Sequence, residues 1–471
     1  MWKDSSRSLL RILKWLCLAT LIGIVVGVCD GAFLKLLDVA IGTRNTIPCF
    51  YVALPFALYL VALLSRKVAK AHKDYSTDAV IKRINAYQPV SLCSAAKTFV
   101  LSIVTMAAGG SAGKEAPCAD VGAGVSAFIA RVLRLSPQDQ RKMMICGVSA
   151  GFAGVFGVPV SGALFGLEVL WVGHLFYEVM FPALVAGITA YGVTSYLGVN
   201  YLYHPLAFAP VFSEQFFLKV IVAGVFFGLI SVLFIEISKL AKIVLRYITA
   251  HSSMFMTCMV GGLALVLIGH FISPSYLGLG MAGIDGPLSG APLESPLGFL
   301  YKIITTSITL AAGGIGGLIT PIFFVGSQAG AMLADFLHVD SATLAALGLV
   351  AVLAGTANTP LAASIMAIEL FGAPIAPYAT VACVISFLLT GKQSIFPHQR
   401  ISLDSGKMTD QASAYQGPGR RATDRNQLPS RTLVTTQMRH RIKRFWPQRT
   451  TRQDVIARGR QRVHQVSGKK K

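Results

Sequence analysis

Long apolar runs dominate the sequence, and most charged residues lie in the short segments between them. Taken with their flanks, several runs reach the roughly 20 residues that an α-helix needs to cross a bilayer. Five of them are centred on Leu16–Val28, Phe50–Leu64, Leu218–Ile235, Met256–Ile272 and Ala379–Leu389. Because 54% of the residues are hydrophobic and only 13% are charged, a water-soluble domain could not cover itself with polar surface. The sequence therefore predicts an all-α polytopic membrane protein.

One stretch places charged residues inside this apolar setting. Residues 108–117 read Ala-Gly-Gly-Ser-Ala-Gly-Lys-Glu-Ala-Pro, with apolar sequence on both sides. An ionisable residue at membrane depth is costly and is a functional candidate by default, and glycines let the backbone approach a ligand closely. Broken helices are tolerated there only beside protein or a water-filled cavity. We therefore interpret Glu115 as a carboxylate on an ion pathway, before a helix from about Ala116 whose N-terminus favours negative charge.

The same pattern returns in the second half of the chain. Residues Ala108, Gly109, Gly110, Gly113, Pro117, Val121 and Gly122 match Ala312, Gly313, Gly314, Gly317, Pro321, Val325 and Gly326 at one constant offset. A second set between Gly147 and Glu168 matches residues between Gly348 and Glu369 at an offset only three residues smaller. One duplication explains both sets, and such paired, Gly/Pro-interrupted segments point to the binding site of a transporter. We expect membrane halves at residues 15–205 and 206–402, after a basic N-terminal segment at 1–14.

The charged segments predict how the chain lies in the membrane. Basic clusters within 65–72 and 131–142 should be cytoplasmic by the positive-inside rule, whereas residues 273–295, rich in Gly, Pro and Ser, predict an exposed loop. From Gly406 onward there are seventeen Lys or Arg against three Asp or Glu, which is fourteen of the net 21 positive charges. We interpret residues 403–471 as a disordered, basic cytoplasmic tail. It could contact anionic lipid, serve only for orientation and solubility, or bind nucleic acid.

The sequence gives little support for cofactor binding or for enzyme activity. The eight cysteines lie mostly in or beside apolar runs without a C-x-x-C pair, which favours packing over disulfides or metal. The glycine-rich stretch fails as a P-loop, because Ala108 stands where the first glycine is needed and Glu115 replaces Ser/Thr. An intramembrane enzyme would have to use Glu115, Glu168 and Glu369 with a histidine such as His174. The matched positions of Glu168 and Glu369 favour a shared structural role instead, so we expect no enzyme, no metal and no cofactor.

Three motifs, in this order and at this spacing, resemble the CLC family of chloride channels and proton-coupled anion antiporters. Residues 113–117, Gly-Lys-Glu-Ala-Pro, resemble the family's Gly-Arg/Lys-Glu-Gly-Pro motif, and residues 317–321, Gly-Leu-Ile-Thr-Pro, resemble its Gly-x-Phe-x-Pro motif. Residues 159–168 resemble the segment leading to the family's internal glutamate. The resemblance covers roughly Leu16–Phe396. It implies two inverted halves of tilted, partly discontinuous helices, assembled as a homodimer with one pore per subunit.

The resemblance also assigns roles around an anion site near the midplane. It implies that Glu115 is the gating carboxylate, and that the backbone amides of Leu318 and Ile319, which follow Gly317, coordinate the anion. Two glycine-preceded helix starts can hold a dehydrated anion without a full positive charge, so that the ion can leave again.

Three family positions are altered here. The family's Gly-Ser-Gly-Ile-Pro motif is missing near residues 74–78, so Ser76 is the candidate hydroxyl, with an N-cap as the alternative. Phe396 is the nearest match to a pore-lining tyrosine but lacks the hydroxyl, and simple packing is its alternative role. Val169 stands in place of the internal proton glutamate, which leaves the adjacent Glu168 as the candidate for a proton route.

Together these features predict transport of chloride or a similar small anion, linked to protons, by a multi-pass protein of the inner cell membrane. Both termini are expected in the cytoplasm. Two alternatives stay open: a passive voltage-gated chloride channel, and an exchanger that prefers fluoride.

Overall fold

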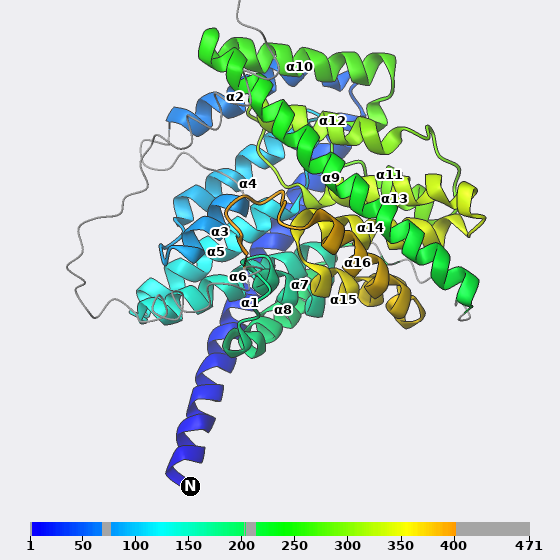
Figure 1. Ribbon diagram of the computed structural model, residues 1–471. Coiled ribbons are helices and arrows are strands. Elements are labelled where there is room, and N and C mark those ends of the chain that lie inside the picture. Colours follow the sequence, from blue (N-terminus) through cyan, green and yellow to red (C-terminus); the bar gives the residue numbers. More distant parts are fainter. Residues whose placement is uncertain (1, 68–76, 202, 204–212, 402–471) are drawn as a thin grey trace, which may run out of the picture. The chain divides into compact units, whose positions relative to one another are not determined.

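The computed structural model describes residues 2–67, 77–201, 203 and 213–401 (Figure 1). Side chains are described from Leu9 onward, except those of residues 66 and 67. Ser76 and the basic tail lie outside the described residues. The described residues all belong to one compact unit, Met1–Ser405.

Helices make up nearly all regular structure of the described chain. The first half contains α1 (Trp2–Asn45), η1 (Phe50–Ala53), α2 (Leu54–Lys67), α3 (Thr77–Asn85), α4 (Leu92–Ala107), α5 (Glu115–Val132), α6 (Pro137–Phe156), α7 (Pro159–Glu168), β1 (Trp171–Val172) and α8 (Tyr177–Tyr196). The second half contains α9 (Glu214–His251), α10 (Met254–Phe271), η2 (Pro274–Tyr276), α11 (Met281–Leu288), α12 (Gly298–Ala311), α13 (Ile319–Leu337), α14 (Ser341–Ala357), α15 (Pro360–Phe371), η3 (Ala373–Ile375), α16 (Ala376–Thr390) and β2 (Arg400–Ile401). Strands β1 and β2 pair in parallel.

The lengths of these helices fit a bilayer. Within the described chain, six helical stretches are long and apolar enough to cross a membrane, among them α1, α8, α9, α10 and α13. Others, such as α7 and α15, have ten and twelve residues and reach only part of the way across at 1.5 Å per residue. The prediction of an all-α polytopic protein with discontinuous helices is therefore confirmed. The basic residues at 2–14 belong to α1, which continues without a break into the first span.

Local signals in the sequence set several helix ends. Helix α6 begins after Ser136, whose hydroxyl accepts the N–H of Asp139 at 3.2 Å, and Pro137 occupies its first turn, an arrangement typical of helix starts. It ends at Gly157, which adopts a left-handed conformation with φ of 72° that suits glycine.

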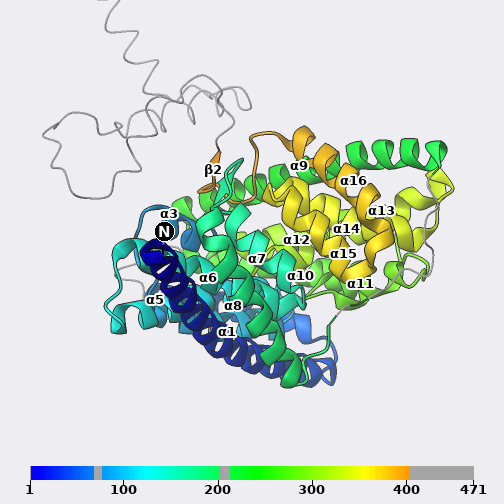
Figure 2. The same ribbon diagram turned by 90° about the horizontal axis from the view of Figure 1, so that it is seen from below.

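The two halves meet through their glycine-rich loops. The N–H of Gly113 donates to the carbonyl of Gly317 at 2.8 Å, and the N–H of Gly317 donates to the carbonyl of Gly113 at 2.7 Å. This antiparallel bridge joins matched residues of the duplication, so the two loops run in opposite directions at this point. In Figure 2, α1, α5, α6 and α8 lie on one side and α13, α14 and α16 lie on the other, with α7 and α15 at the boundary.

Matched glycines also allow close helix packing within each half. A Cβ atom on Gly122 of α5 would lie 2.1 Å from the carbonyl oxygen of Gly147 in α6. In the second half, a Cβ on Gly326 of α13 would lie 2.3 Å from the carbonyl oxygen of Gly348 in α14. Real Cβ atoms cannot approach so closely, so the α5–α6 and α13–α14 contacts depend on glycine at these positions.

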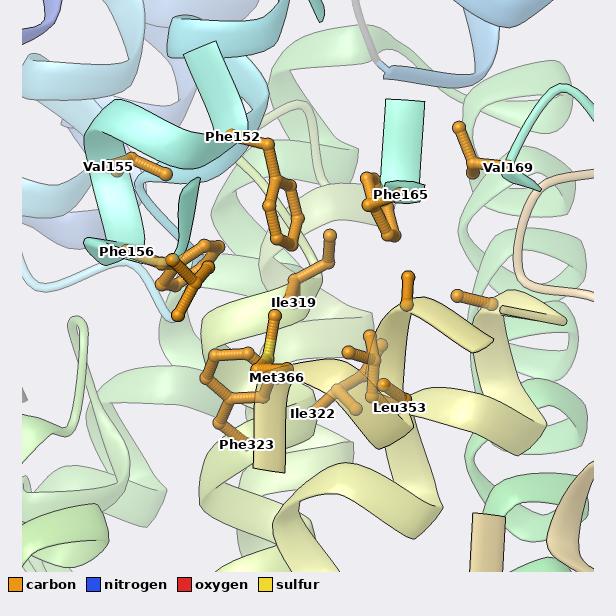
Figure 3. Packing of buried hydrophobic residues seen from close by; sticks show 14 of the residues in the cluster. Phe152, Val155, Phe156, Phe165, Val169, Ile319, Ile322, Phe323, Leu353 and Met366 are labelled. Atoms are coloured by element: carbon orange, nitrogen blue, oxygen red, sulfur yellow. The ribbon is translucent and has the colours of Figure 1, made fainter. Parts of the chain in front are cut away.

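Buried aromatic residues from both halves fill the space around the loops (Figure 3). The rings of Phe152 and Phe165 stack with centroids 4.0 Å apart. The ring of Phe156 at the end of α6 lies 5.0 Å from that of Phe323 in α13, so this packing joins the two halves. Ile319 belongs to the same buried cluster as Phe152.

The segment 273–295 differs from its prediction as an exposed loop. It contains η2 and α11, and the side chains of Tyr276 and Ile284 are buried. The ammonium group of Lys302, which is 0% exposed, donates to the carbonyls of Tyr276 at 3.3 Å and Gly278 at 2.8 Å. The prediction was wrong because Gly and Pro indicate turns but do not show whether other elements cover them.

Candidate anion site

The carboxylate of Glu115 lies at the N-terminus of a helix from the opposite half. Glu115 is the first residue of α5 and is 2% exposed. Its Oε1 accepts the N–H of Ile319 at 2.6 Å. Its Oε2 accepts the hydroxyl of Thr320 at 2.9 Å and the N–H of Thr320 at 3.4 Å. Because Ile319 and Thr320 open α13, the side chain caps α13, and not only its own helix.

Two glycines make room for this carboxylate. A Cβ atom on Gly317 would lie 1.7 Å from Oε1 of Glu115, and one on Gly113 would lie 2.3 Å from Oε2. Any side chain at either position would overlap the carboxylate. The matched glycines of the duplication therefore form the two walls of one small anionic site.

The donors in this site are neutral. Backbone N–H groups at a helix start carry partial positive charge, and with the helix dipole they favour an anion without pairing it to a cation. Hydrogen bonds to a charged acceptor contribute about 1.5–3 kcal/mol each. The site can thus hold one negative charge firmly, yet exchange it for another that uses the same donors.

Among the predicted anion ligands, the structure brings Gly317 and Ile319 together with Glu115, and Leu318 is the residue directly before α13. The contact of the Thr320 hydroxyl with the Glu115 carboxylate is one that the sequence interpretation missed. Its signal was available, because a hydroxyl residue in the first turn of a helix that follows a glycine-rich break is suited to bind at the helix start. Lys302 was missed as well, although a lysine inside an apolar run is unusual.

The sequence interpretation also named Ser76 and Phe396 as candidates. Ser76 lies outside the described residues. Phe396 is buried in the main apolar cluster, which fits its packing alternative. Asp78, in the first turn of α3, accepts the backbone N–H of His398 at 2.8 Å, and its carboxylate also pairs with the His398 ring. The start of α3 and the segment that carries Phe396 are therefore held together.

Glu168 and Glu369 cap each other's helices. Glu168, at the end of α7, accepts two amides from the first turn of α15, and Glu369, near the end of α15, accepts two from the first turn of α7. The donors are Leu361 at 3.1 Å and Ala362 at 2.8 Å for Glu168, and Val160 at 2.9 Å and Ser161 at 2.8 Å for Glu369. This reciprocal arrangement is the shared structural role that the matched positions predicted.

A cavity of about 390 Å³ leads to the site. Lys114, Thr320, Tyr201 and Asp285 are among its lining residues. Burial raises the pKa of Tyr201 to about 12, so its phenol stays neutral, and it donates to the carbonyl of Gly154 at 3.0 Å. Since Thr320 contacts both the cavity and Glu115, an ion in this mouth would meet the donors that now hold the carboxylate.

Sequence comparison finds related proteins over most of the chain. A family profile described as "Voltage gated chloride channel" matches residues 56–391. A "Chloride/fluoride channel protein" of Pseudomonas syringae pv. tomato is 36% identical over 83% of this chain and 87% of its own length. A "Voltage-gated ClC-type chloride channel ClcB" of Salmonella typhimurium is 26% identical over 61% of this chain and 71% of its own.

Solved structures share the fold. The structure of a CLC-type fluoride/proton antiporter superposes with a TM-score of 0.78 at 26% identity, over 83% of this chain and 98% of the other. That of a slow cyanobacterial Cl−/H+ antiporter superposes with a TM-score of 0.70 at 18% identity, over 80% and 94%, a likeness that concerns the fold alone.

Proposed function

The chain belongs to the voltage-gated chloride channel family, the CLC family, and transports anions across a membrane; from this we propose that transport is coupled to protons and gated by Glu115. One observation carries the proposal: the Glu115 carboxylate accepts the hydrogen bonds of the α13 N-terminus, where an anion would otherwise bind. Carboxylate and anion compete for the same donors, so occupancy by one excludes the other.

Protonation then decides which of them is bound. An ionised Glu115 and a halide repel each other in a site of low dielectric constant, whereas a protonated Glu115 is neutral and loses its advantage at the helix start. Each time an anion takes the place of the carboxylate, Glu115 binds a proton, and each return of the carboxylate releases it. The two ions move in opposite directions when Glu115 takes its proton from the side to which the anion leaves and releases it to the side from which the anion enters.

For the anion, we propose chloride and fluoride, with fluoride preferred. Support comes from two relatives whose names include fluoride, a chloride/fluoride channel protein and a fluoride/proton antiporter. The donor set of amides and the Thr320 hydroxyl also suits a small, strongly hydrogen-bonding ion. Lys114, which lines the cavity, would raise the local anion concentration at the mouth.

Purified protein in sealed liposomes tests the proposal. We expect an imposed fluoride or chloride gradient to drive protons uphill, and Glu115→Gln to carry anions at a rate nearly independent of pH, because its side chain no longer titrates. Glu178→Gln is the control, since Glu178 lies on the surface in an ion pair with Lys142. A Glu115→Gln flux with the pH dependence of the wild type would refute the gating role.

A passive anion channel is the second candidate. It is favoured by Val169, which is fully buried and stands where the resemblance places an internal proton glutamate. Glu168 beside it is engaged by two amides of α15, so a proton route past it would need water instead of this carboxylate. Rapid anion flux without uphill proton movement would favour the channel over the exchanger.

We further propose an inner-membrane homodimer with both termini in the cytoplasm. Lys14 of α1 pairs with Asp139 at 2.7 Å, and Lys142 pairs with Glu178 at 2.6 Å, so the N-terminal part of α1, the start of α6 and the start of α8 share one side. The basic residues gathered there favour the cytoplasm. The cavity lies toward the other end of α6, at Phe156, and so faces outward.

The proposed homodimer is tested by light scattering of the protein–detergent complex. A mass that corresponds to one subunit would show that the proposal of a homodimer is wrong.

A further inference from the structure

Two buried threonines connect the halves next to the glycine loops. Thr105 on α4 and Thr309 on α12 occupy matched positions of the duplication and are 1% and 0% exposed. The Oγ1 atom of Thr105 accepts the N–H of Ile315 at 3.1 Å, and that of Thr309 accepts the N–H of Ser111 at 3.1 Å. Ser111 and Ile315 are matched as well, so each threonine holds the loop of the opposite half.

The hydroxyl hydrogens do not take part in these two contacts. The hydroxyl of Thr105 donates to the carbonyl of Leu101 at 2.8 Å, and that of Thr309 donates to the carbonyl of Thr305 at 2.8 Å. Each Oγ1 atom therefore acts on the loop only as an acceptor. A buried amide without an acceptor is strongly disfavoured, so the loop amides depend on these oxygen atoms.

The held amides lie close to the anion site. Ser111 precedes Glu115 by four residues, and Ile315 precedes Ile319 by four residues. Thr309 thus fixes the loop that carries the carboxylate, and Thr105 fixes the loop that carries its amide donors. Between them, Gly113 and Gly317 form their two reciprocal hydrogen bonds.

We propose that Thr105 and Thr309 form a reciprocal clamp that sets the Glu115 carboxylate against the start of α13. They are positioning residues, since they act through the loops and not on the anion. The inference rests on the proposed role of Glu115 in coupling anions to protons. When both loops are fixed, neither can move away to make room for the carboxylate and an anion together. The two therefore compete for the same donors at the start of α13.

The clamp is not symmetric in strength. The hydroxyl of Ser111 shares a further hydrogen bond with that of Thr306 at 2.8 Å. At the matched positions stand Ile315, which has no hydroxyl, and Ser102, whose Oγ has no hydrogen-bond partner among the described residues. The loop around Ser111 therefore has two side-chain anchors close to Glu115. In the matched loop, Thr105 holds the amide of Ile315, and a second side chain acts only at the start of the loop, where the Cys258 thiol donates to the carbonyl of Ala312 at 3.1 Å.

Substitution by valine, which keeps the shape and removes the acceptor, tests the clamp. We expect Thr105→Val to lower the ratio of uphill proton flux to anion flux by about tenfold, which is the change expected if the free energy of one buried hydrogen bond acts wholly on the position of the carboxylate. Thr309→Val should lower it less, because the Ser111–Thr306 bond remains. Thr105→Ser and Thr309→Ser should restore the ratio, since serine keeps the acceptor.

Thr189→Val is the matched control, because the hydroxyl of Thr189 in α8 only donates to the carbonyl of Val185 at 2.7 Å. If Thr105→Val assembles and keeps the wild-type flux ratio, or if serine fails to restore it, the clamp is refuted. If Thr105→Val does not fold, the comparison of Thr309→Val with Thr309→Ser decides in the same way. If instead the proposed gating role of Glu115 is wrong, Glu115→Gln would keep the pH dependence of wild-type anion flux. This result separates failure of the gating role from failure of the clamp.

Discussion

At the scale of single residues, the site depends on two positions, Gly113 and Gly317, that have no side chain. Gly113 and Gly317 do not adopt positive φ angles, so backbone freedom does not explain them. Their role is steric, because the Glu115 carboxylate occupies the volume that their side chains would fill. The first turn of α13 is thereby open to a carboxylate or an ion of similar size.

One methyl group added at Gly317 should therefore disturb the site. In Gly317→Ala the new Cβ would lie 1.7 Å from Oε1 of Glu115, so either the carboxylate or the loop must move. Overpacking of this kind costs about 1–3 kcal/mol, and we expect anion flux in liposomes to fall more than about tenfold in protein that still assembles. Gly192→Ala is the control, because no atom lies within 4 Å of the added Cβ. Wild-type flux in Gly317→Ala would contradict the steric role.

At the scale of elements, the short helices need partners at their ends. Helices α7 and α15 meet at the boundary between the halves (Figure 2), and their first turns would bury unpaired N–H groups there. The carboxylates of Glu168 and Glu369 satisfy these groups and oppose the positive end of each dipole. The two helices thereby form one symmetric, mutually capped pair.

The symmetry of this pair supplies a test of the proton route. If both residues only cap helices, Glu168→Gln and Glu369→Gln should each lower the free energy of unfolding by about 1 kcal/mol and leave proton coupling intact. Thermal unfolding in detergent and the flux ratio in liposomes measure the two effects. A loss of coupling in Glu168→Gln that Glu369→Gln does not share would instead place Glu168 on the proton route.

Much of this arrangement could be predicted from the sequence. The duplicated glycines indicated two related halves, and Gly113 and Gly317, which occupy matched positions, meet in one antiparallel bridge. The placement of Glu115 at the start of a helix was also predicted, although its contact with Thr320 of the other half was not. The roles of Glu115, Leu318, Ile319, Ser76 and Phe396 in transport stay predictions.

The remaining features depend on distances between segments far apart in the chain. A threonine in an apolar helix commonly donates to the carbonyl four residues back, and Thr105 and Thr309 do so. Their second contact, to an amide of the opposite half, follows only from the packing of α4 and α12 around the loops. The same holds for Lys302, whose acceptors come from a segment that composition alone assigns to solvent.

At the scale of the whole molecule, the positive charge is distributed unevenly. The membrane unit carries basic residues at Lys14, Arg131, Arg134 and Lys142 on the side of its Lys14–Asp139 and Lys142–Glu178 pairs. Fourteen of the net 21 positive charges follow Gly406, in the tail. The last described element is β2, whose partner β1 directly precedes α8, so the described chain ends on this same basic side.

The charge of the tail and the composition of the membrane unit predict separable functions. Every residue proposed to contact the anion precedes Ile401, and the tail has too few apolar residues to join a membrane core. Truncation after Asp404 should therefore leave anion flux and the ratio of proton flux to anion flux unchanged.

The membrane unit cannot be removed from the bilayer, so the attraction of the tail to lipid is measured with a soluble peptide of residues 406–471 and vesicles containing anionic lipid. We expect binding that weakens with salt, because screening reduces attraction between the basic residues and the surface. A truncated protein that assembles but carries no anion would show that the tail belongs to the transport pathway. A peptide that ignores anionic vesicles would leave orientation and solubility as its roles.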